Sequence, residues 1–249
     1  MKDYVAIVSG AASGLGQAVM CDLAAKGTPV AAVDLNAIDA ADLPESCVSY
    51  ACDVSDADAV NQVVAKVAET MGKIGVLVNC AGIAPGSKIV GRKGQHDPAL
   101  FAKVLAVNTV GTFNLLTAVA AQMQSQDPDE IGQRGVIVMT ASVAAYEAQI
   151  GQIAYAASKG AVAAMTLPAA RELAQSGIRV VTIAPGVFAT PMMLNMPQEV
   201  QDSIGATIPF PAKLSDPSDF ASLVGHIIEN STLNGEVIRL DGALRMAAR

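Results

Sequence analysis

The chain has 249 residues, 52% of them hydrophobic and 16% charged, which is typical of a globular protein with a large core. Its formal net charge is −7 and it has no run of basic residues, which argues against nucleic acid or an anionic membrane surface as partner. Gly, Pro or Asp interrupts the apolar runs short of the ~20 residues of a membrane span, and the N-terminus shows no signal-peptide pattern. We therefore expect a soluble, cytoplasmic protein.

The cysteines and histidines are too scattered to predict a metal site. No C-x-x-C spacing is present, so we expect reduced, mostly buried thiols. Neither histidine lies near Ser142 in the sequence and there is no G-x-S-x-G motif, which disfavours a Ser–His hydrolase. The residues concerned are Cys21, Cys47, Cys52, Cys80, His96 and His226.

Short apolar runs alternate with helical patterns along the whole chain. The predicted strands are YVAIVS, PVAAVDL, CVSYACDV, IGVLVNCAG, GVIVMTAS, IRVVTIAPG and EVIRLDGA. The predicted helices span about residues 15–26, 56–71, 98–124, 154–175 and 217–230. Continuous rather than alternating apolar strands indicate a parallel sheet covered on both faces. We predict an α/β protein with one domain, residues 1–249, built on a doubly wound parallel sheet (Rossmann fold).

In such sheets ligands bind beyond the carboxyl ends of the strands. The first strand is followed by SGAASGLG, in which Gly10, Gly14 and Gly16 let the backbone turn tightly and approach a pyrophosphate. The spacing is G-x-x-x-G-x-G, and a flexible turn alone would look the same. Its place between the first strand and the first helix favours nucleotide binding. Ser13 and Leu15 lie in the same turn and offer side-chain or backbone contacts to the cofactor.

The second predicted strand ends at Asp34. A carboxylate at this place can accept hydrogen bonds from both ribose hydroxyls of an adenosine and would repel a 2′-phosphate. No Lys or Arg lies in the glycine turn or at positions 35–37. An ordinary loop aspartate is the alternative, but beside the glycines Asp34 favours NAD over NADP.

The third and fourth predicted strands end in further cofactor candidates. Asp53 can accept a hydrogen bond from an adenine amino group with Val54 packed nearby, although Asp53 can equally be a helix N-cap. The fourth strand ends in NCAG, where the small residues Cys80, Ala81 and Gly82 let the chain pass close to a ribose. We expect Cys80 to be a packed small residue rather than a reactive thiol.

Ser142, Tyr155 and Lys159 are the candidate catalytic residues. If Tyr155 opens a helix, Lys159 lies on the same face one turn later. An ammonium beside a phenol favours its anion, so we expect the pKa of Tyr155 to fall from roughly 10 and the phenol to exchange a proton with an alcohol or carbonyl. Ser142 can hold the same substrate oxygen. A helix start with a surface lysine is the alternative, and for Asn108 in the long helix a structural and a proton-relay role are both open.

Taken together, these motifs resemble the short-chain dehydrogenase/reductase family over essentially the whole chain. The motifs are Gly10/Gly14/Gly16, Asp53, NCAG, Asn108, Ser142, Tyr155, Lys159 and Pro185-Gly186. Ser9 stands where the family usually has Thr, and Cys80 where most members have a second Asn. Stretches such as NCAGIA, TASVAA, MTLPAAR and LNGEVIRLDGA resemble one subfamily, the type 2 3-hydroxyacyl-CoA dehydrogenases (17β-hydroxysteroid dehydrogenase type 10), which shares this Cys.

The resemblance implies a proton-transfer role for Tyr155, with Lys159 lowering its pKa and binding the nicotinamide ribose. It implies that Ser142 orients the substrate oxygen and that Asn108 holds a water linking Lys159 to solvent. At the nicotinamide end of NAD it implies contacts from the segment after the sixth strand. The residues of that segment are Pro185, Gly186, Phe188 and Thr190.

On the substrate side, residues 188–213 lie where this family carries a mobile lid. Its apolar residues suit an acyl chain or a ring system, although they can equally pack on the core. Gln149 can touch the substrate. The loop 84–97 has basic side chains that can meet CoA phosphates, or that are simply solvated, and the resembled enzymes have a longer stretch there. The lid residues are Met192, Met193, Leu194 and Met196, and the basic ones are Lys88, Arg92, Lys93 and His96.

The preferred prediction is an NAD-dependent dehydrogenase that converts a 3-hydroxyacyl-CoA to a 3-oxoacyl-CoA. A hydroxysteroid or a small secondary alcohol or ketone is the alternative substrate, while Asp34 argues against an NADPH-dependent ketoacyl reductase. A non-catalytic NAD-binding scaffold is a remote alternative, because such a protein is expected to lose Tyr155 or Lys159. The resemblance also implies a homotetramer formed through the helices near 98–124 and 154–175 and the C-terminal segment.

Overall fold

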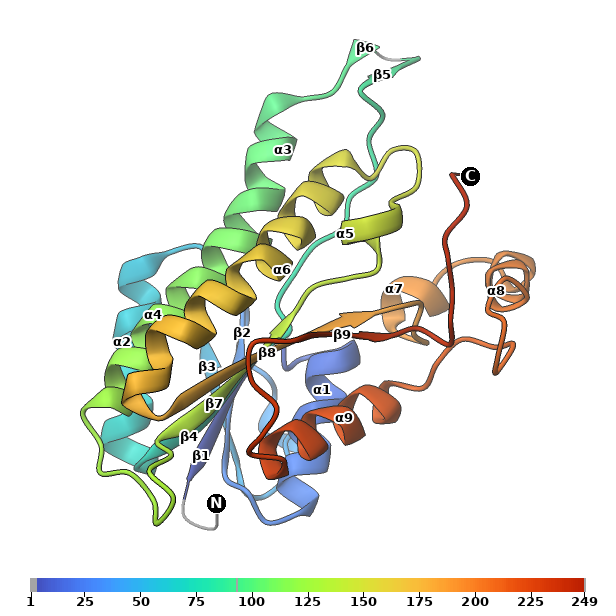
Figure 1. The fold of residues 1–249 in the computed structure, drawn as a ribbon. Coiled ribbons are helices and arrows are strands. Elements are labelled where there is room, and N and C mark those ends of the chain that lie inside the picture. The colour runs from blue at the N-terminus through green and yellow to red at the C-terminus, as the bar shows by residue number, and fades with distance from the viewer. Residues whose placement is uncertain (1–3, 93, 249) are drawn as a thin grey trace.

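A seven-stranded parallel sheet with helices on both faces forms the body of the molecule (Figure 1). The computed structural model describes residues 4–92 and 94–248. In space the strands lie in the order β3-β2-β1-β4-β7-β8-β9. They are β1 (Val5–Ser9), β2 (Val30–Asp34), β3 (Cys47–Ala51), β4 (Ile74–Asn79), β7 (Gly135–Thr140), β8 (Ile178–Pro185) and β9 (Val237–Leu240). The predicted α/β class and doubly wound sheet are confirmed.

Both faces of the sheet are buried, which explains why the strands are continuously apolar. Leu77 packs into the core under one helical layer, and its neighbour Val78 into the core under the other. The first layer contains α2 (Ala57–Met71), α4 (Gly111–Gln124) and α6 (Ile153–Leu173), and the second contains α1 (Gly14–Ala25) and α9 (Pro217–Glu229). Each of the predicted helix ends in these layers lies within two residues of the observed one.

The predicted long helix over 98–124 contains a change of winding. The helix α3 (Pro98–Leu105) continues through a π-helical turn, η2 (Ala106–Val110), into α4. Such turns are rare and often occur at functional sites. Among the described helices this run is the one long and apolar enough to cross a membrane, with a mean hydropathy of 1.6, but 44% of its most apolar window is buried in the molecule. A core helix has the same properties.

Short elements appear where the sequence predicted loops or, for the 3-10 turn η3, at the end of the helix predicted over residues 154–175. They lack the length over which a periodic pattern can be recognised. They are η1 (Ala40–Asp42), the hairpin of β5 (Val90–Gly91) and β6 (Gly94–Gln95), α5 (Ala144–Glu147), η3 (Ala174–Ser176), α7 (Pro191–Leu194) and α8 (Gln198–Gly205). The hairpin, α5, α7 and α8 all lie toward the carboxyl end of the sheet (Figure 1).

Candidate active site

The chain reverses its direction across the sheet between β1 and β4, the place where doubly wound sheets bind nucleotides. The glycine turn after β1 lies there. Gly10 has φ of +66°, and a side chain on it would stand 2.8 Å from the backbone nitrogen of Ala81. A side chain on Gly16 would collide with the carbonyl oxygen of Gly10. The turn is therefore backbone packed on backbone, and only glycine fits.

The hydroxyl of Ser9 ties this turn to the end of β4. Its Oγ accepts hydrogen bonds from the backbone nitrogens of Cys80 (3.2 Å) and Ala81 (3.3 Å). The hydroxyl that Ser9 shares with the more usual Thr thus has a structural use. Burial raises the pKa of the Cys80 thiol to about 11, so it stays protonated at neutral pH. This agrees with the prediction of a packed residue rather than a reactive thiol.

Asp34 lies beside the glycine turn at the end of β2. Its carboxylate accepts hydrogen bonds from the backbone nitrogens of Ala12 (3.0 Å) and Leu35 (2.8 Å). At the start of α1, Ser13 occupies the N-cap position, and no side chain of the described residues caps the helix. Its first N–H groups can therefore meet a phosphate. Leu15 packs partly on the core, so its contact with a cofactor would come from its backbone.

After β3, the structure excludes one of the two roles proposed for Asp53, that of helix N-cap. Asp56, and not Asp53, caps α2, accepting from the nitrogens of Asp58 and Ala59. Asp53 Oδ1 instead accepts from the side chain (2.7 Å) and the nitrogen (2.9 Å) of Ser55, which lowers the pKa of Asp53. The side chain of Val54 is buried in the core. Val54 can thus contact a cofactor only through its backbone, or affect it indirectly by packing beneath the residues that bind it.

The structure brings the three predicted catalytic residues together. Ser142 follows β7, and its hydroxyl forms a hydrogen bond with Tyr155 in the first turn of α6. One turn later, Lys159 Nζ lies 5.9 Å from the centre of the Tyr155 ring and donates to the carbonyl oxygen of Thr140 at 2.6 Å. Sequence analysis did not identify Thr140, because a backbone acceptor leaves no signal in residue type.

The predicted direction of the Tyr155 pKa shift is wrong in this structure. Burial raises the pKa of Tyr155 above 10, and the hydrogen bond from Ser142 opposes this only in part. Burial also lowers the pKa of Lys159 to about 8. The sequence showed the spacing of the two groups but not their burial, and burial destabilises the charged form of both.

Asn108 has the structural role that was one of its two expected roles. It is buried in the π-helical turn, where its side chain accepts from the nitrogen of Ile83 (2.8 Å) and donates to the Ile83 carbonyl (2.9 Å) and to Ser158 Oγ (3.0 Å). It therefore joins the segment after β4 to α6. A side chain on Gly82 would lie 3.2 Å from Asn108 Oδ1 and 3.7 Å from Lys159 Nζ, so these groups line one narrow space. We call the region between the glycine turn, the Ser142–Tyr155–Lys159 group and residues 188–213 the cleft.

The segment after β8 reaches the glycine turn. A side chain on Gly14 would lie 3.2 Å from the methyl group of Thr190, which places Thr190 over the start of α1. Pro185 ends β8, and the nitrogen of Gly186 donates to Leu240. The ring of Phe188 is turned away from the cleft and packs edge-on against Phe220 of α9. A contact of Phe188 with a nicotinamide would have to come from its backbone.

The substrate-side candidates lie on short segments around the cleft. In the lid, Leu194 and Met196 are exposed and Met193 is half-buried, while the side chain of Met192 lies outside the described part. Gln149 is half-buried between α5 and α6, and its nitrogen donates to Gln152. In the hairpin loop two basic side chains are exposed. They are Lys88 and Arg92, whereas His96 is half-buried with its ring edge-on to Phe101, and Lys93 lies outside the described residues.

The fold and the Ser142–Tyr155–Lys159 group define a class of nicotinamide-dependent oxidoreductases. The model of the short chain dehydrogenase family matches residues 4–201 of the chain. The chain belongs to this family, which confirms the resemblance inferred from its motifs.

Individual members of the family resemble the chain over nearly its whole length. A 3-hydroxyacyl-CoA dehydrogenase type-2 from Homo sapiens is 48% identical over 252 residues, covering 99% of this chain and 97% of the relative. The crystal structure of a 3-hydroxyacyl-CoA dehydrogenase type-2 from Mycobacterium avium has a TM-score of 0.92 at 38% identity, covering 99% of this chain and 98% of the other. An ipsdienol dehydrogenase from Ips pini is 31% identical, with 98% of each chain covered.

Proposed function

We propose that this protein is an NAD-dependent dehydrogenase that interconverts a 3-hydroxyacyl-CoA and a 3-oxoacyl-CoA. The proposal rests on the Ser142–Tyr155–Lys159 group, in which Ser142 and Lys159 are buried and Tyr155 is partly buried. This group lies at the same sheet edge as Asp34 and the glycine turn. The names and high identity of the relatives support the choice of an acyl-CoA substrate.

The residues at the end of β1 and β2 fit NAD. The glycine turn and the uncapped start of α1, with its free N–H groups, suit a pyrophosphate, and the carboxylate of Asp34 suits the unphosphorylated adenosine ribose. When bound, NAD supplies the hydride acceptor. The choice of NAD over NADP rests on Asp34 and on the absence of basic residues at positions 35–37.

The orientation of Ser142 follows from its neighbours. The nitrogen of Ala144 donates to Ser142 Oγ at 3.1 Å, so the hydroxyl proton of Ser142 is free to point toward Tyr155 and the substrate oxygen. Tyr155 takes the proton of the substrate hydroxyl during oxidation and returns it during ketone reduction. Lys159, held by the Thr140 carbonyl, supplies positive charge beside the phenolate and would bind the nicotinamide ribose. A water in the narrow space that Asn108 and Lys159 line would connect Lys159 to solvent.

The acyl chain lies under residues 188–213, which form a lid. Leu194 and Met196 of this segment offer flexible apolar surface, and Gln149 faces the substrate from the opposite rim. The basic hairpin with Lys88 and Arg92 lies toward the same end of the sheet and can meet CoA phosphates.

The test is the initial rate of NAD reduction with each enantiomer of 3-hydroxybutyryl-CoA, compared with free 3-hydroxybutyrate, a hydroxysteroid and a simple secondary alcohol. A kcat/KM for the CoA ester well above the others is the expected result. Equal or higher values for the other alcohols would overturn the choice of substrate but not that of chemistry. Replacing NAD by NADP in the same assay tests the cofactor, and we expect NADP to be the poorer substrate.

A hydroxysteroid or small secondary alcohol is the second candidate. The exposed apolar lid would accept a ring system as well as an acyl chain, and one relative is named as an ipsdienol dehydrogenase. The same assay panel separates the two candidates.

We also infer a cytoplasmic homotetramer without nucleic-acid or membrane partners. Several apolar side chains are about half exposed on the outer face of η2, α4 and α6, where a second copy can cover them. They are Val110 (45%), Phe113 (50%), Ile153 (42%) and Leu167 (45%). Light scattering coupled to size-exclusion chromatography tests this inference, and we expect Phe113→Glu to yield smaller species.

A further inference from the structure

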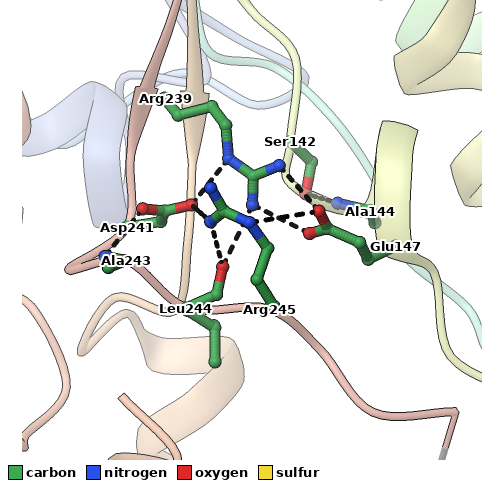
Figure 2. Close-up of polar contacts among 8 residues, drawn as sticks. All are labelled: Ser142, Ala144, Glu147, Arg239, Asp241, Ala243, Leu244 and Arg245. Carbon is green, nitrogen blue, oxygen red and sulfur yellow. Dashed lines mark hydrogen bonds and ion pairs between the residues drawn. The ribbon is translucent and has the colours of Figure 1, made fainter. Parts of the chain in front are cut away.

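An ionic cluster joins the helix after Ser142 to the end of the sheet (Figure 2). Glu147, the last residue of α5, accepts two hydrogen bonds from Arg239 of β9, at 2.9 Å from Nη1 and 2.8 Å from Nη2. Arg239 Nε donates to Asp241 at 2.8 Å. Arg245 of the C-terminal segment donates to Asp241 at 3.2 Å and lies 3.5 Å from Glu147. We call these four residues the Arg239 cluster.

The cluster is balanced in charge and partly removed from water. It contains two carboxylates and two guanidinium groups, and the side chains of Arg239, Glu147 and Asp241 are 24%, 26% and 7% exposed. The two parallel bonds between Arg239 and Glu147 fix the angle of approach as well as the distance. Hydrogen bonding by Arg239 lowers the pKa of Glu147, so the carboxylate stays ionised at neutral pH.

Helix α5 depends on such a contact for its position. It has four residues, too few to be stable as a helix by themselves. Ala144 is buried, but Tyr146 is 52% exposed, and its ring lies against the guanidinium group of Arg239 with 5.4 Å between them. Apolar burial therefore holds α5 only weakly, and the strongest contact at its far end is the one between Glu147 and Arg239.

The position of α5 determines the position of the Ser142 hydroxyl. The nitrogen of Ala144 donates to Ser142 Oγ, and the nitrogen of Ala145 donates to the Ser142 carbonyl at 3.0 Å. We propose that the Glu147–Arg239 pair is a positioning device for Ser142, which holds α5 so that the Ser142 hydroxyl faces Tyr155 and the substrate oxygen. This inference rests on the proposed function.

The same cluster reaches the nicotinamide side of the cleft. Arg239 is paired in the sheet with Ala184, next to Pro185, whose carbonyl accepts from the nitrogen of Val143 at 3.0 Å. Asp241 packs on Gly186, where a side chain would stand 2.8 Å from its Cα. The cluster thus sets Ser142 relative to the Pro185–Gly186 segment as well as to Tyr155.

The test compares Glu147→Gln and Arg239→Lys with a matched control, Glu69→Gln. Glu69 pairs with Lys66 on the exposed surface of α2, away from the cleft, with side-chain exposures of 71% and 57%. Steady-state rates with 3-hydroxybutyryl-CoA give kcat and KM. The tyrosinate absorbance of each protein, minus that of the same protein carrying Tyr155→Phe, gives the titration of Tyr155 without any substrate.

For Glu147→Gln we expect kcat to fall about 10- to 100-fold, the effect of a small misplacement of a reacting group, with NAD affinity unchanged. We also expect Tyr155 to titrate at higher pH, because it loses the hydrogen bond from Ser142 that lowers its pKa. Arg239→Lys keeps the charge but not the paired bonds, so it should lie between wild type and Glu147→Gln. Glu69→Gln should match wild type.

A Glu147→Gln protein with a lower melting temperature but an unchanged Tyr155 titration would overturn the proposal, since the pair would then be structural only. A Glu69→Gln protein with a similar loss would also overturn it. If the wild type does not oxidise 3-hydroxybutyryl-CoA, the proposed substrate fails. The tyrosinate titration still decides whether Glu147 positions Ser142.

Discussion

The two halves of the cleft are built in different ways. In the cofactor half, backbone packs on backbone, as between Gly10 and Ala81, and the sheet fixes these positions. In the substrate half, short segments are held by side chains, as in the Arg239 cluster, and large apolar groups such as Leu194 (53%) and Phe210 (83%) remain exposed. The difference implies that the cofactor half tolerates little change, whereas the substrate half can be altered without loss of the fold. Relatives named for a 3-hydroxyacyl-CoA and for ipsdienol agree with this division.

The largest expected effect lies where the two halves meet. Tyr155→Phe removes the group that transfers the proton, so we expect kcat to fall about 10³-fold. NAD affinity and melting temperature should stay near those of wild type. Steady-state rates measure kcat, a binding titration measures the NAD affinity, and thermal unfolding measures the melting temperature. Activity within tenfold of wild type would refute the role of Tyr155, and a wild type equally inert on all alcohols while binding NAD would favour the scaffold alternative.

Two glycine substitutions compare the halves directly. Gly16→Ala places a methyl group against the Gly10 carbonyl, and we expect a loss of about 3 kcal/mol or more in the free energy of unfolding. Gly205→Ala in α8 meets only ordinary contacts, the nearest at 3.5 Å, and should stabilise the protein by about 0.5–1 kcal/mol. Chemical denaturation measures both. Equal effects would contradict the proposed difference in tolerance.

The same difference explains which features the sequence could predict. Strand ends such as Asp34 and Ser142 follow from apolar runs, because the carboxyl ends of parallel strands meet at one edge. The fold, the position of each motif at the end of a strand, and the meeting of Ser142 with Tyr155 could therefore be predicted from the sequence. The glycine spacing likewise predicted the tight turn after β1, but not that Gly10 packs on the backbone of Ala81.

Features that depend on packing were not accessible. The pKa of Tyr155 depends on its burial, which spacing does not show, and the predicted direction was wrong. The packing of the Phe188 ring in the core and the hydrogen bonds of Asn108 with Ile83 and Ser158 can be seen only in the three-dimensional structure. The contact of Glu147 with Arg239 joins residues 92 positions apart, and no spacing or residue pattern in the sequence links the two.

Asp34→Ser tests the specificity of the cofactor half. The substitution removes the carboxylate that suits a ribose diol and repels a 2′-phosphate, so kcat/KM for NAD should fall about 10- to 100-fold, corresponding to 1–3 kcal/mol. The value for NADP should rise relative to NAD. Asp39→Ser, in the exposed segment after β2, is the control. An unchanged ratio of the two cofactors would remove the basis for the NAD assignment.

The pH dependence of the reaction rates tests the protonation state of Tyr155, which lies where the two halves of the cleft meet. Oxidation needs the phenolate of Tyr155, whose pKa is raised by burial, so kcat/KM for the alcohol should rise about tenfold per pH unit through the neutral range. Reduction needs the phenol of Tyr155 and the charge of Lys159, so it should change little below the Lys159 pKa of about 8 and fall above it. Rates in both directions over the same buffers measure this. A plateau of oxidation near neutral pH would show that bound NAD lowers the pKa of Tyr155.

The smallest expected effect lies at the rim of the substrate half. Lys88 and Arg92 are exposed, and an exposed charge contributes about 0–1 kcal/mol to an ionic contact. Lys88→Ala and Arg92→Ala should therefore each raise KM for 3-hydroxybutyryl-CoA by at most about fivefold, and kcat should not change. Rates with free 3-hydroxybutyrate, which lacks the phosphates, should be unaffected, as should the control Lys66→Ala on α2. Because the effect is electrostatic, added salt should abolish it. A KM that is unchanged at low salt would place the CoA phosphates elsewhere, and a change of equal size with the free acid would show that the hairpin acts through its structure.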